Sequence, residues 1–148
     1  MSLVVVADTN ALYRLLDPRL SGHEAHKKAL SAVSRLVISP MVLAELDYLV
    51  ASRAGARKAV VAAQFIMRNV TLRRFEIPDL GDHLPVAIAV AEEYEDAGGG
   101  KGVGLTDAMN VALAAAYSTD AMFTSDRHFR MMRPLTGHSA FRLLPDDL

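Results

Sequence analysis

The sequence predicts an α/β fold, a sandwich of helices around a mostly parallel central sheet of four to five strands. Short apolar runs, the first of them rich in valine, alternate with longer segments that carry helix start and stop signals. The 148 residues are 51% hydrophobic and 22% charged, as in a globular protein. Since no linker or internal repeat divides it, residues 1–148 are expected to form a single domain.

Local signals place the elements in order along the chain. Strands are expected at residues 3–7, 36–38, 71–77, 121–123 and 140–144. Helices are expected at residues 11–16, 21–34, 40–53, 57–68, 79–96 and 106–117. Pro18 stops the first helix, and Ser21 with Glu24 forms a capping box for the second. Ser39 followed by Pro40 is an N-cap with proline at the first helical position.

Glycines separate the remaining helices. Gly55 divides a helical hairpin into its two arms. Residues 97–104 contain five glycines and are interpreted as a flexible loop, after which Thr106 is expected to cap the next helix. The loop does not match a phosphate-binding motif, because Gly102 stands where Ser or Thr would bind Mg²⁺.

The net charge of −1 hides a block distribution of charged residues. Residues 48–75 carry six bases and no acid, residues 75–100 carry seven acids and no base, and residues 127–145 carry four bases and no acid. Such segregation can give a folded surface a positive face, as nucleic-acid binding requires. A solvated helix face is the alternative explanation for any one block.

Several protein classes are excluded or disfavoured by composition. The chain contains no cysteine, which excludes a disulfide scaffold, a thiol nucleophile and a cysteine-ligated metal. No basic segment precedes residues 3–7, so no export signal is expected. The longest apolar stretch, residues 84–91, is far shorter than the ~18 residues of a membrane span. We therefore expect a cytoplasmic protein.

Four acidic residues are placed where a ligand site would form. Asp8 follows the first strand and Asp126 follows the fourth, while Asp107 lies in the first turn of the helix after the glycine-rich loop. Glu45 lies on the helix that Ser39 opens. Because ligands of open parallel sheets bind beyond the carboxyl ends of the strands, we expect these carboxylates to converge there.

Three of these acids also have a structural explanation, since Asp8, Asp107 and Asp126 could serve only as caps or turn formers. Glu45 is harder to explain in that way, because its helical neighbours at spacings of three and four are all apolar or aromatic. Those neighbours are Met41, Val42, Tyr48 and Leu49. A carboxylate in such surroundings is expected to be paired, protonated or bound to a cation.

A cluster of carboxylates also implies a counter-ion. Two carboxylates about 4 Å apart repel by roughly 4 kcal/mol at an effective dielectric constant of 20. Oxygen ligands favour the hard cations Mg²⁺ and Mn²⁺ over zinc. Such ions keep open coordination positions that serve phosphate chemistry, so the pattern indicates a metal-dependent site.

These motifs resemble the four acidic motifs of PIN-domain ribonucleases. They are Asp8-Thr9-Asn10, Ser39 with Glu45, Leu105-Thr106-Asp107-Ala108 and Thr124-Ser125-Asp126-Arg127-His128-Phe129. The resemblance covers nearly the whole chain in the order and at the spacing of that family. The size of the chain makes it similar to the VapC-type toxins of type II toxin–antitoxin pairs.

The resemblance implies a PIN-like α/β/α fold and a Mg²⁺- or Mn²⁺-dependent endoribonuclease, the toxin of a VapBC-type system. Asp8, Glu45, Asp107 and Asp126 would be catalytic, with Asp8, Asp107 and Asp126 as metal ligands. Asn10 and Thr124 would be supporting polar residues. The implied partners are an RNA substrate, a VapB-like antitoxin and a second copy of the chain in a homodimer.

Arginines that flank the acidic motifs are candidates for binding RNA phosphates. They are Arg53, Arg57, Arg73, Arg127 and Arg130. Two alternatives stay open at this point. One is a non-catalytic PIN-like module that binds RNA or protein, and the other is a small metal-dependent phosphatase.

Overall fold

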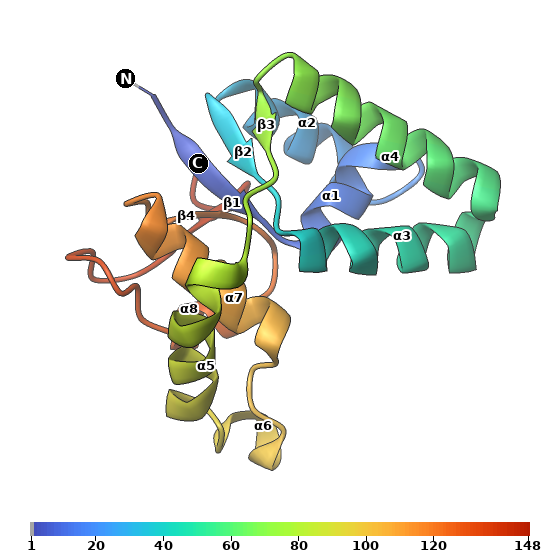
Figure 1. Ribbon diagram of the computed structural model, residues 1–148. Coiled ribbons are helices and arrows are strands. Elements are labelled where there is room, and N and C mark those ends of the chain that lie inside the picture. Colours follow the sequence, from blue (N-terminus) through green and yellow to red (C-terminus); the bar gives the residue numbers. More distant parts are fainter. Residues whose placement is uncertain (1) are drawn as a thin grey trace.

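The computed structural model describes residues 2–148 and contains one five-stranded parallel sheet (Figure 1). The strands are β1 (Val4–Ala7), β2 (Arg35–Val37), β3 (Phe75–Glu76), β4 (Ala121–Phe123) and β5 (Arg142–Leu144). Their order across the sheet is β3-β2-β1-β4-β5, and every neighbouring pair is parallel. The predicted fold class is confirmed, with a sheet that is parallel throughout.

Helices cover both faces of the sheet. They are α1 (Thr9–Leu16), α2 (His23–Ser31), α3 (Pro40–Ala54), α4 (Ala56–Thr71), α5 (Leu84–Glu93), α6 (Ala97–Gly100), α7 (Leu105–Ala116) and α8 (His128–Met131). Alternate residues of β1 point to opposite faces, as a strand requires. Val5 packs with α1 to α4 in one core, and Val6 packs with α5, α7 and α8 in the other. No helix within residues 2–148 is long and apolar enough to cross a membrane.

The start of α2 differs from the sequence prediction. Ser21 and Glu24 do not form a capping box, because α2 begins at His23 after Gly22, which adopts a left-handed conformation with φ 83°. His26 bonds the Gly22 carbonyl through Nδ1 at 2.7 Å. By contrast, the predicted start of α3 is confirmed, since the Ser39 side chain accepts a hydrogen bond from the Met41 backbone N–H.

Other predicted boundaries were wrong by several residues. The strand predicted at 71–77 shrinks to Phe75–Glu76, because α4 continues to Thr71. The helix predicted at 79–96 is divided into a 3₁₀ turn at Gly81–His83 and α5, which has a proline in its first turn. Thr106 is not a cap, since α7 begins at Leu105. Two short helices were not predicted: α8, and α6, which occupies the first half of the loop predicted at 97–104 and is irregular at Gly98 and Gly99.

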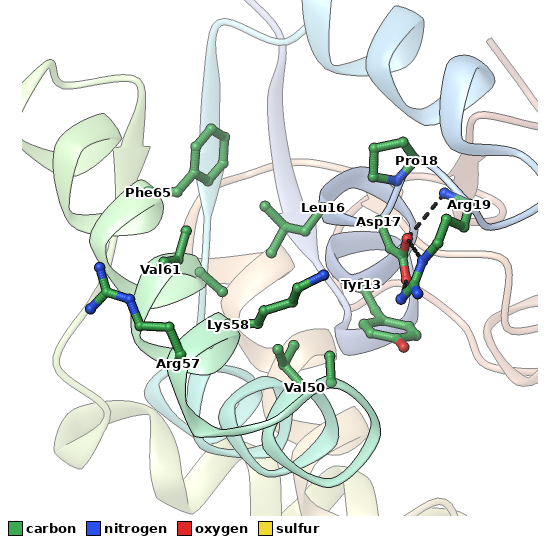
Figure 2. A pocket seen from close by; sticks show the side chains of 12 residues that line it. Tyr13, Leu16, Asp17, Pro18, Arg19, Val50, Arg57, Lys58, Val61 and Phe65 are labelled. Carbon is green, nitrogen blue, oxygen red and sulfur yellow. Dashed lines mark hydrogen bonds and ion pairs between the residues drawn. The ribbon is translucent and has the colours of Figure 1, made fainter.

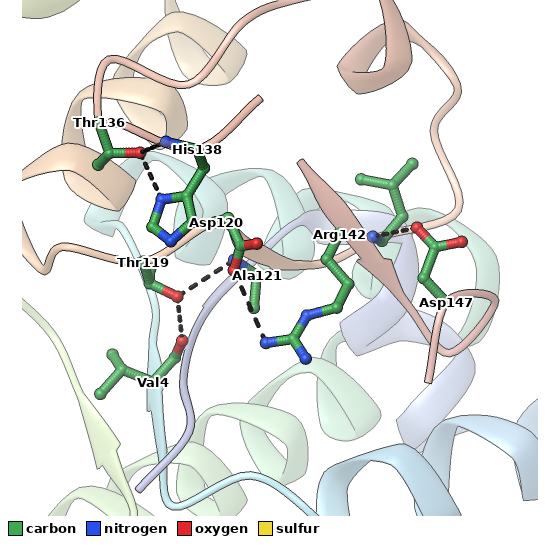
Figure 3. Close-up of polar contacts among 9 residues, drawn as sticks. Val4, Thr119, Asp120, Ala121, Thr136, His138, Arg142 and Asp147 are labelled. Carbon is green, nitrogen blue, oxygen red and sulfur yellow. Dashed lines mark hydrogen bonds and ion pairs between the residues drawn. The ribbon is translucent and has the colours of Figure 1, made fainter. Parts of the chain in front are cut away.

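Polar contacts at the amino ends of the strands hold the register of the sheet (Figure 3). The Thr119 hydroxyl donates to the Val4 carbonyl at 2.6 Å and accepts from the Ala121 N–H at 3.1 Å, which ties β1 to β4. Asp120 forms an ion pair with Arg142 of β5 at 3.6 Å. In this register Ala7 is paired with Phe123, so the residues that follow β1 and β4 lie side by side.

Candidate active site

All four predicted acids line one cleft at the carboxyl edge of the sheet. The cleft has a volume of about 340 Å³. It is lined by Asp8, Thr9, Asn10, Glu45, Tyr48, Leu49, Asp107 and Asp126. The starts of α1 and α3 lie beside the carboxyl end of β1, as expected for a site built on the ends of parallel strands (Figure 1).

Asp8 is the most enclosed of the four acids, with 5% of its surface exposed. It is the N-cap of α1, and its Oδ1 accepts from the Thr9 N–H at 2.8 Å. Its Oδ2 accepts from the Thr124 hydroxyl at 2.9 Å. Burial raises the pKa of Asp8, the two hydrogen bonds lower it, and the charges of Asp126 and Glu45 raise it further. Asp8 is therefore both a structural cap and a member of the acidic cluster.

Asp107 carries the least compensated charge of the cleft. It lies in the first turn of α7, and no hydrogen bond or ion pair to its side chain occurs within residues 2–148. Burial raises the pKa of Asp107 to about 7, with further contributions from the negative charges of Asp8, Asp126 and Glu45. A cation bound beside it would relieve this repulsion.

Glu45 lies in the cleft but is not enclosed as its sequence neighbours suggested. The residue is exposed, and Tyr48 one turn later is 77% exposed, so the prediction of an apolar environment was wrong. What positions Glu45 is a hydrogen bond across 36 residues, in which the Thr9 hydroxyl donates to Oε1 at 2.7 Å. The helix face that carries Glu45 is open to solvent, as a substrate site requires.

Asp126 lies at the start of α8, where it brings a histidine to the acids. Its Oδ1 accepts from the His128 backbone N–H at 2.9 Å, and His128 Nδ1 lies 3.4 Å from the same oxygen. One ligand atom from each of Asp107, Asp126 and His128 lies within 4.8 Å of the others, close enough to share a metal ion. The donor set is dominated by carboxylate oxygens, which fits a hard divalent cation.

The two predicted supporting residues have different surroundings. Thr124 is fully buried, donates to Asp8 Oδ2, and accepts from the Asp126 backbone N–H at 2.9 Å. It therefore orients two of the acids at once. Asn10 is exposed and forms part of the cleft wall, without a side-chain hydrogen bond within residues 2–148.

Two of the arginines predicted to bind RNA are either far from the cleft or paired with an acid. Arg73 precedes β3 at the amino edge of the sheet, whereas the cleft lies at the carboxyl edge. Arg130 forms a bidentate ion pair with Asp147, at 2.6 and 2.8 Å. These positions do not favour RNA contacts at the cleft. Sequence distance from an acidic motif does not specify the edge of the sheet on which a base lies, or the acid with which it pairs.

The other three arginines lie in different surroundings, and none of them lines the cleft. Arg127 is exposed and directly follows Asp126. Arg53 lies over the ring of Tyr13, 5.4 Å from its centroid, near the end of α3. Arg57 begins the other arm of the hairpin and lines a separate groove. Of the five candidate arginines, Arg127 is the one adjacent in sequence to a cleft acid.

Thr9 and His128 are the site residues that sequence reasoning missed. Both lie inside the quoted motifs, directly after Asp8 and two residues after Asp126. Their roles depend on contacts that the motif spacing does not encode: Thr9 bonds an acid of another helix, and His128 approaches Asp126 because α8 starts there.

Comparison with known proteins identifies the family of the chain. Residues 5–133 match the PIN domain family. The chain is 35% identical over 144 residues to Ribonuclease VapC26 of Mycobacterium tuberculosis, covering 95% of this chain and 100% of that protein.

Two solved structures share the fold. One is the VapC20 toxin of M. tuberculosis, described as cleaving the sarcin-ricin loop, with a TM-score of 0.65, 22% identity and coverage of 83% of this chain and 90% of that chain. The other is VapBC2 of Rickettsia felis bound to a promoter DNA fragment, with a TM-score of 0.66, 20% identity and coverage of 90% and 96%. The resemblance found in the sequence is therefore confirmed, and the chain belongs to the PIN-domain family.

Proposed function

We propose that this protein is a divalent-metal-dependent endoribonuclease and the toxin of a VapBC-type toxin–antitoxin pair. The observation that carries the proposal is the convergence of four carboxylates in one open cleft. One follows β1, two lie on α3 and α7, and one precedes α8. The family match and the 35% identity to a VapC ribonuclease support RNA as the substrate.

The metal would be held by Asp8, Asp107 and Asp126, with Mg²⁺ or Mn²⁺ as the ion. When bound, it would supply a water of lowered pKa and neutralise charge on the phosphoryl oxygens. The chain itself contributes orientation. Thr124 holds Asp8 through its side chain and Asp126 through its backbone, and Thr9 holds Glu45.

The proposed reaction is hydrolysis of an RNA phosphodiester by in-line attack of water, which leaves a 3′-hydroxyl and a 5′-phosphate. Asp126 or Glu45 would accept the proton of the attacking water, since both line the cleft and both are more exposed than Asp8. Arg127, which is exposed and directly follows Asp126, would bind an RNA phosphate beside the reacting group.

The proposal is tested by RNA cleavage with the Asp8→Asn and Asp107→Asn variants. Each removes a charged ligand while keeping the side-chain shape, and we expect a rate loss on the order of a hundredfold, equivalent to about 3 kcal/mol. Asp47→Asn is the matched control, because Asp47 is an exposed acid of α3 that does not line the cleft. Cleavage by both variants at the wild-type rate, or hydrolysis of a simple phosphomonoester without RNA cleavage, would contradict the assignment.

The antitoxin is proposed to bind a groove between α1 and the α3–α4 hairpin (Figure 2). The groove has a volume of about 630 Å³ and a largely apolar lining that includes Tyr13, Leu16, Val61 and Phe65. Arg57 points away from the groove, and Lys58 extends across it toward Asp17 (Figure 2). This combination fits an amphipathic segment with apolar anchors and acidic side chains.

A pair of neighbouring valines tests the antitoxin surface. Val61 lines the groove and is 48% exposed, while Val60 is 46% exposed and does not line it. We expect Val61→Glu to abolish copurification with the antitoxin while RNA cleavage continues, and Val60→Glu to keep the partner. If both variants copurify equally well with the antitoxin, the antitoxin does not bind in this groove.

Two further parts of the proposal concern the setting of the protein. We propose that it forms a homodimer, which light scattering of the purified chain would test. We also propose that it acts in the cytoplasm, the compartment that holds the RNA substrate. Fractionation of cells that express the natural protein tests that location.

A further inference from the structure

Asn110 is a polar side chain in the most enclosed helix of the protein. Residues 108–114 of α7 are all buried, and Asn110 is 0% exposed. Asparagine is a poor helix former, and a buried amide destabilises a fold unless its donors and acceptor are paired. An apolar residue would suit this position better if packing alone mattered.

The amide of Asn110 is only partly satisfied. Its Nδ2 donates to the carbonyl oxygen of Ala7 at 3.2 Å, across 103 residues of sequence. Its Oδ1 is buried and has no hydrogen-bond partner within residues 2–148. An unpaired buried acceptor costs free energy, so the benefit of this residue lies elsewhere than in overall stability.

Within residues 2–148, the one side-chain hydrogen bond of Asn110 connects the two elements that position Asp8 and Asp107. Ala7 is the last residue of β1 and directly precedes Asp8. Asn110 lies three residues after Asp107 in α7, a spacing that puts both on the same side of the helix. The amide therefore joins the strand end that carries Asp8 to the helix turn that carries Asp107.

We propose that Asn110 is a positioning residue for the divalent-ion site. The carboxylates of Asp8 and Asp107 repel each other, and no residue from 2 to 148 donates a hydrogen bond to the Asp107 side chain. By tying the Ala7 carbonyl to α7, Asn110 keeps the two elements together against this repulsion and fixes the separation of the ligands. This inference rests on the metal dependence of the proposed function.

The test compares metal affinity with stability in the full-length protein. Asn110→Leu replaces the amide with an apolar group of similar branching, and Asn110→Ala removes it. Mn²⁺ binding is measured by electron paramagnetic resonance of the free ion. We expect both variants to bind Mn²⁺ about tenfold more weakly, as for other residues that orient metal ligands. In chelator, Asn110→Leu should unfold at the same urea concentration as the wild type or a higher one.

Asn69→Leu is the matched control. Asn69 is also a buried asparagine within a helix, and its Nδ2 donates to the Phe65 carbonyl of α4 at 2.9 Å, away from the cleft. The Asn69→Leu variant should bind Mn²⁺ with wild-type affinity. Unchanged affinity in both Asn110 variants, or an equal loss in Asn69→Leu, would overturn the positioning role. A wild-type protein that binds no Mn²⁺ would instead overturn the metal-dependent function itself.

Discussion

Replacing Asp107 with Asn should stabilise the metal-free protein while it inactivates the enzyme. The substitution keeps the shape of the side chain and removes its charge. Asp107 makes no side-chain hydrogen bond within residues 2–148, so little is lost in exchange. Its pKa of about 7 reports how unfavourable the charge is, mainly because of burial and then because of Asp8, Asp126 and Glu45.

The sign of the pH dependence follows from that pKa. The folded protein holds the Asp107 proton more tightly than the unfolded chain, whose carboxyl has the ordinary pKa of 3.8. The stability of the wild type should therefore fall as pH rises from about 4 to about 7. For a fully buried carboxylate the difference corresponds to about 4 kcal/mol. Solvent reaches Asp107 through the cleft, so we expect about 1–2 kcal/mol at pH 8.

Urea unfolding in chelator at pH 5 and pH 8 measures the effect. The Asp107→Asn variant should be more stable than the wild type at pH 8, and its advantage should shrink at pH 5. With metal at a hundred times its dissociation constant, the wild type gains about 2.7 kcal/mol and the order should reverse. The reasoning would be refuted if the Asp107→Asn variant were no more stable than the wild type at pH 8 and if the stability of both proteins depended on pH in the same way.

Three other predictions test the surroundings of the site. Thr124→Val removes the hydroxyl that holds Asp8, and Mn²⁺ titration should show about tenfold weaker binding. Leu46→Ala truncates a core side chain that is 1% exposed, and urea unfolding should show a loss of about 2–5 kcal/mol with or without chelator. Arg127→Ala should weaken RNA binding and lower the salt dependence by about one ion, whereas Arg73→Ala at the opposite edge should leave both unchanged.

The elements that could be predicted are those with strong local signals. Ser39 and Pro40 define the start of α3 through a cap and a fixed backbone angle, and both act within three residues. The start of α2 could not be predicted, because tertiary contacts decide it. His23 bonds the Arg14 carbonyl of α1, and His26 packs against the ring of Phe123 from β4. These partners outweigh the capping box that the local sequence offered.

The candidate acids could be predicted from one rule of parallel sheets, that residues after the strands meet at one edge. Asp8 and Asp126 follow β1 and β4, which are neighbours in the sheet. The residues that hold these acids follow no such rule. Thr9 reaches an acid 36 residues away, and Asn110 reaches a carbonyl 103 residues away. Their roles depend on how the layers stack, which periodicity does not specify.

The positions of the arginines in the fold could not be predicted from the sequence either. The base-rich block at residues 48–75 is folded into a hairpin and the turn that follows it. Its two ends therefore point to different parts of the molecule, and Arg73 is carried to the edge opposite the acids. Arg130 is paired with Asp147, an acid of the C-terminal segment. Blocks of like charge in a sequence consequently predict a charged surface without locating it.

The distribution of hydrogen bonds explains why the fold tolerates its acidic cluster and why Asp107 should dominate metal binding. Asp8 receives two donors, and Glu45 and Asp126 receive one each, so their charges are partly compensated by the protein. Asp107 receives none from the part of the chain that the structure describes, and its compensation is left to the ion. The ion must displace the proton of Asp107 when pH falls below about 7. Metal affinity should therefore decrease with acidification, and the Asp107→Asn variant, which has no such proton, should lose that pH dependence along with most of its affinity.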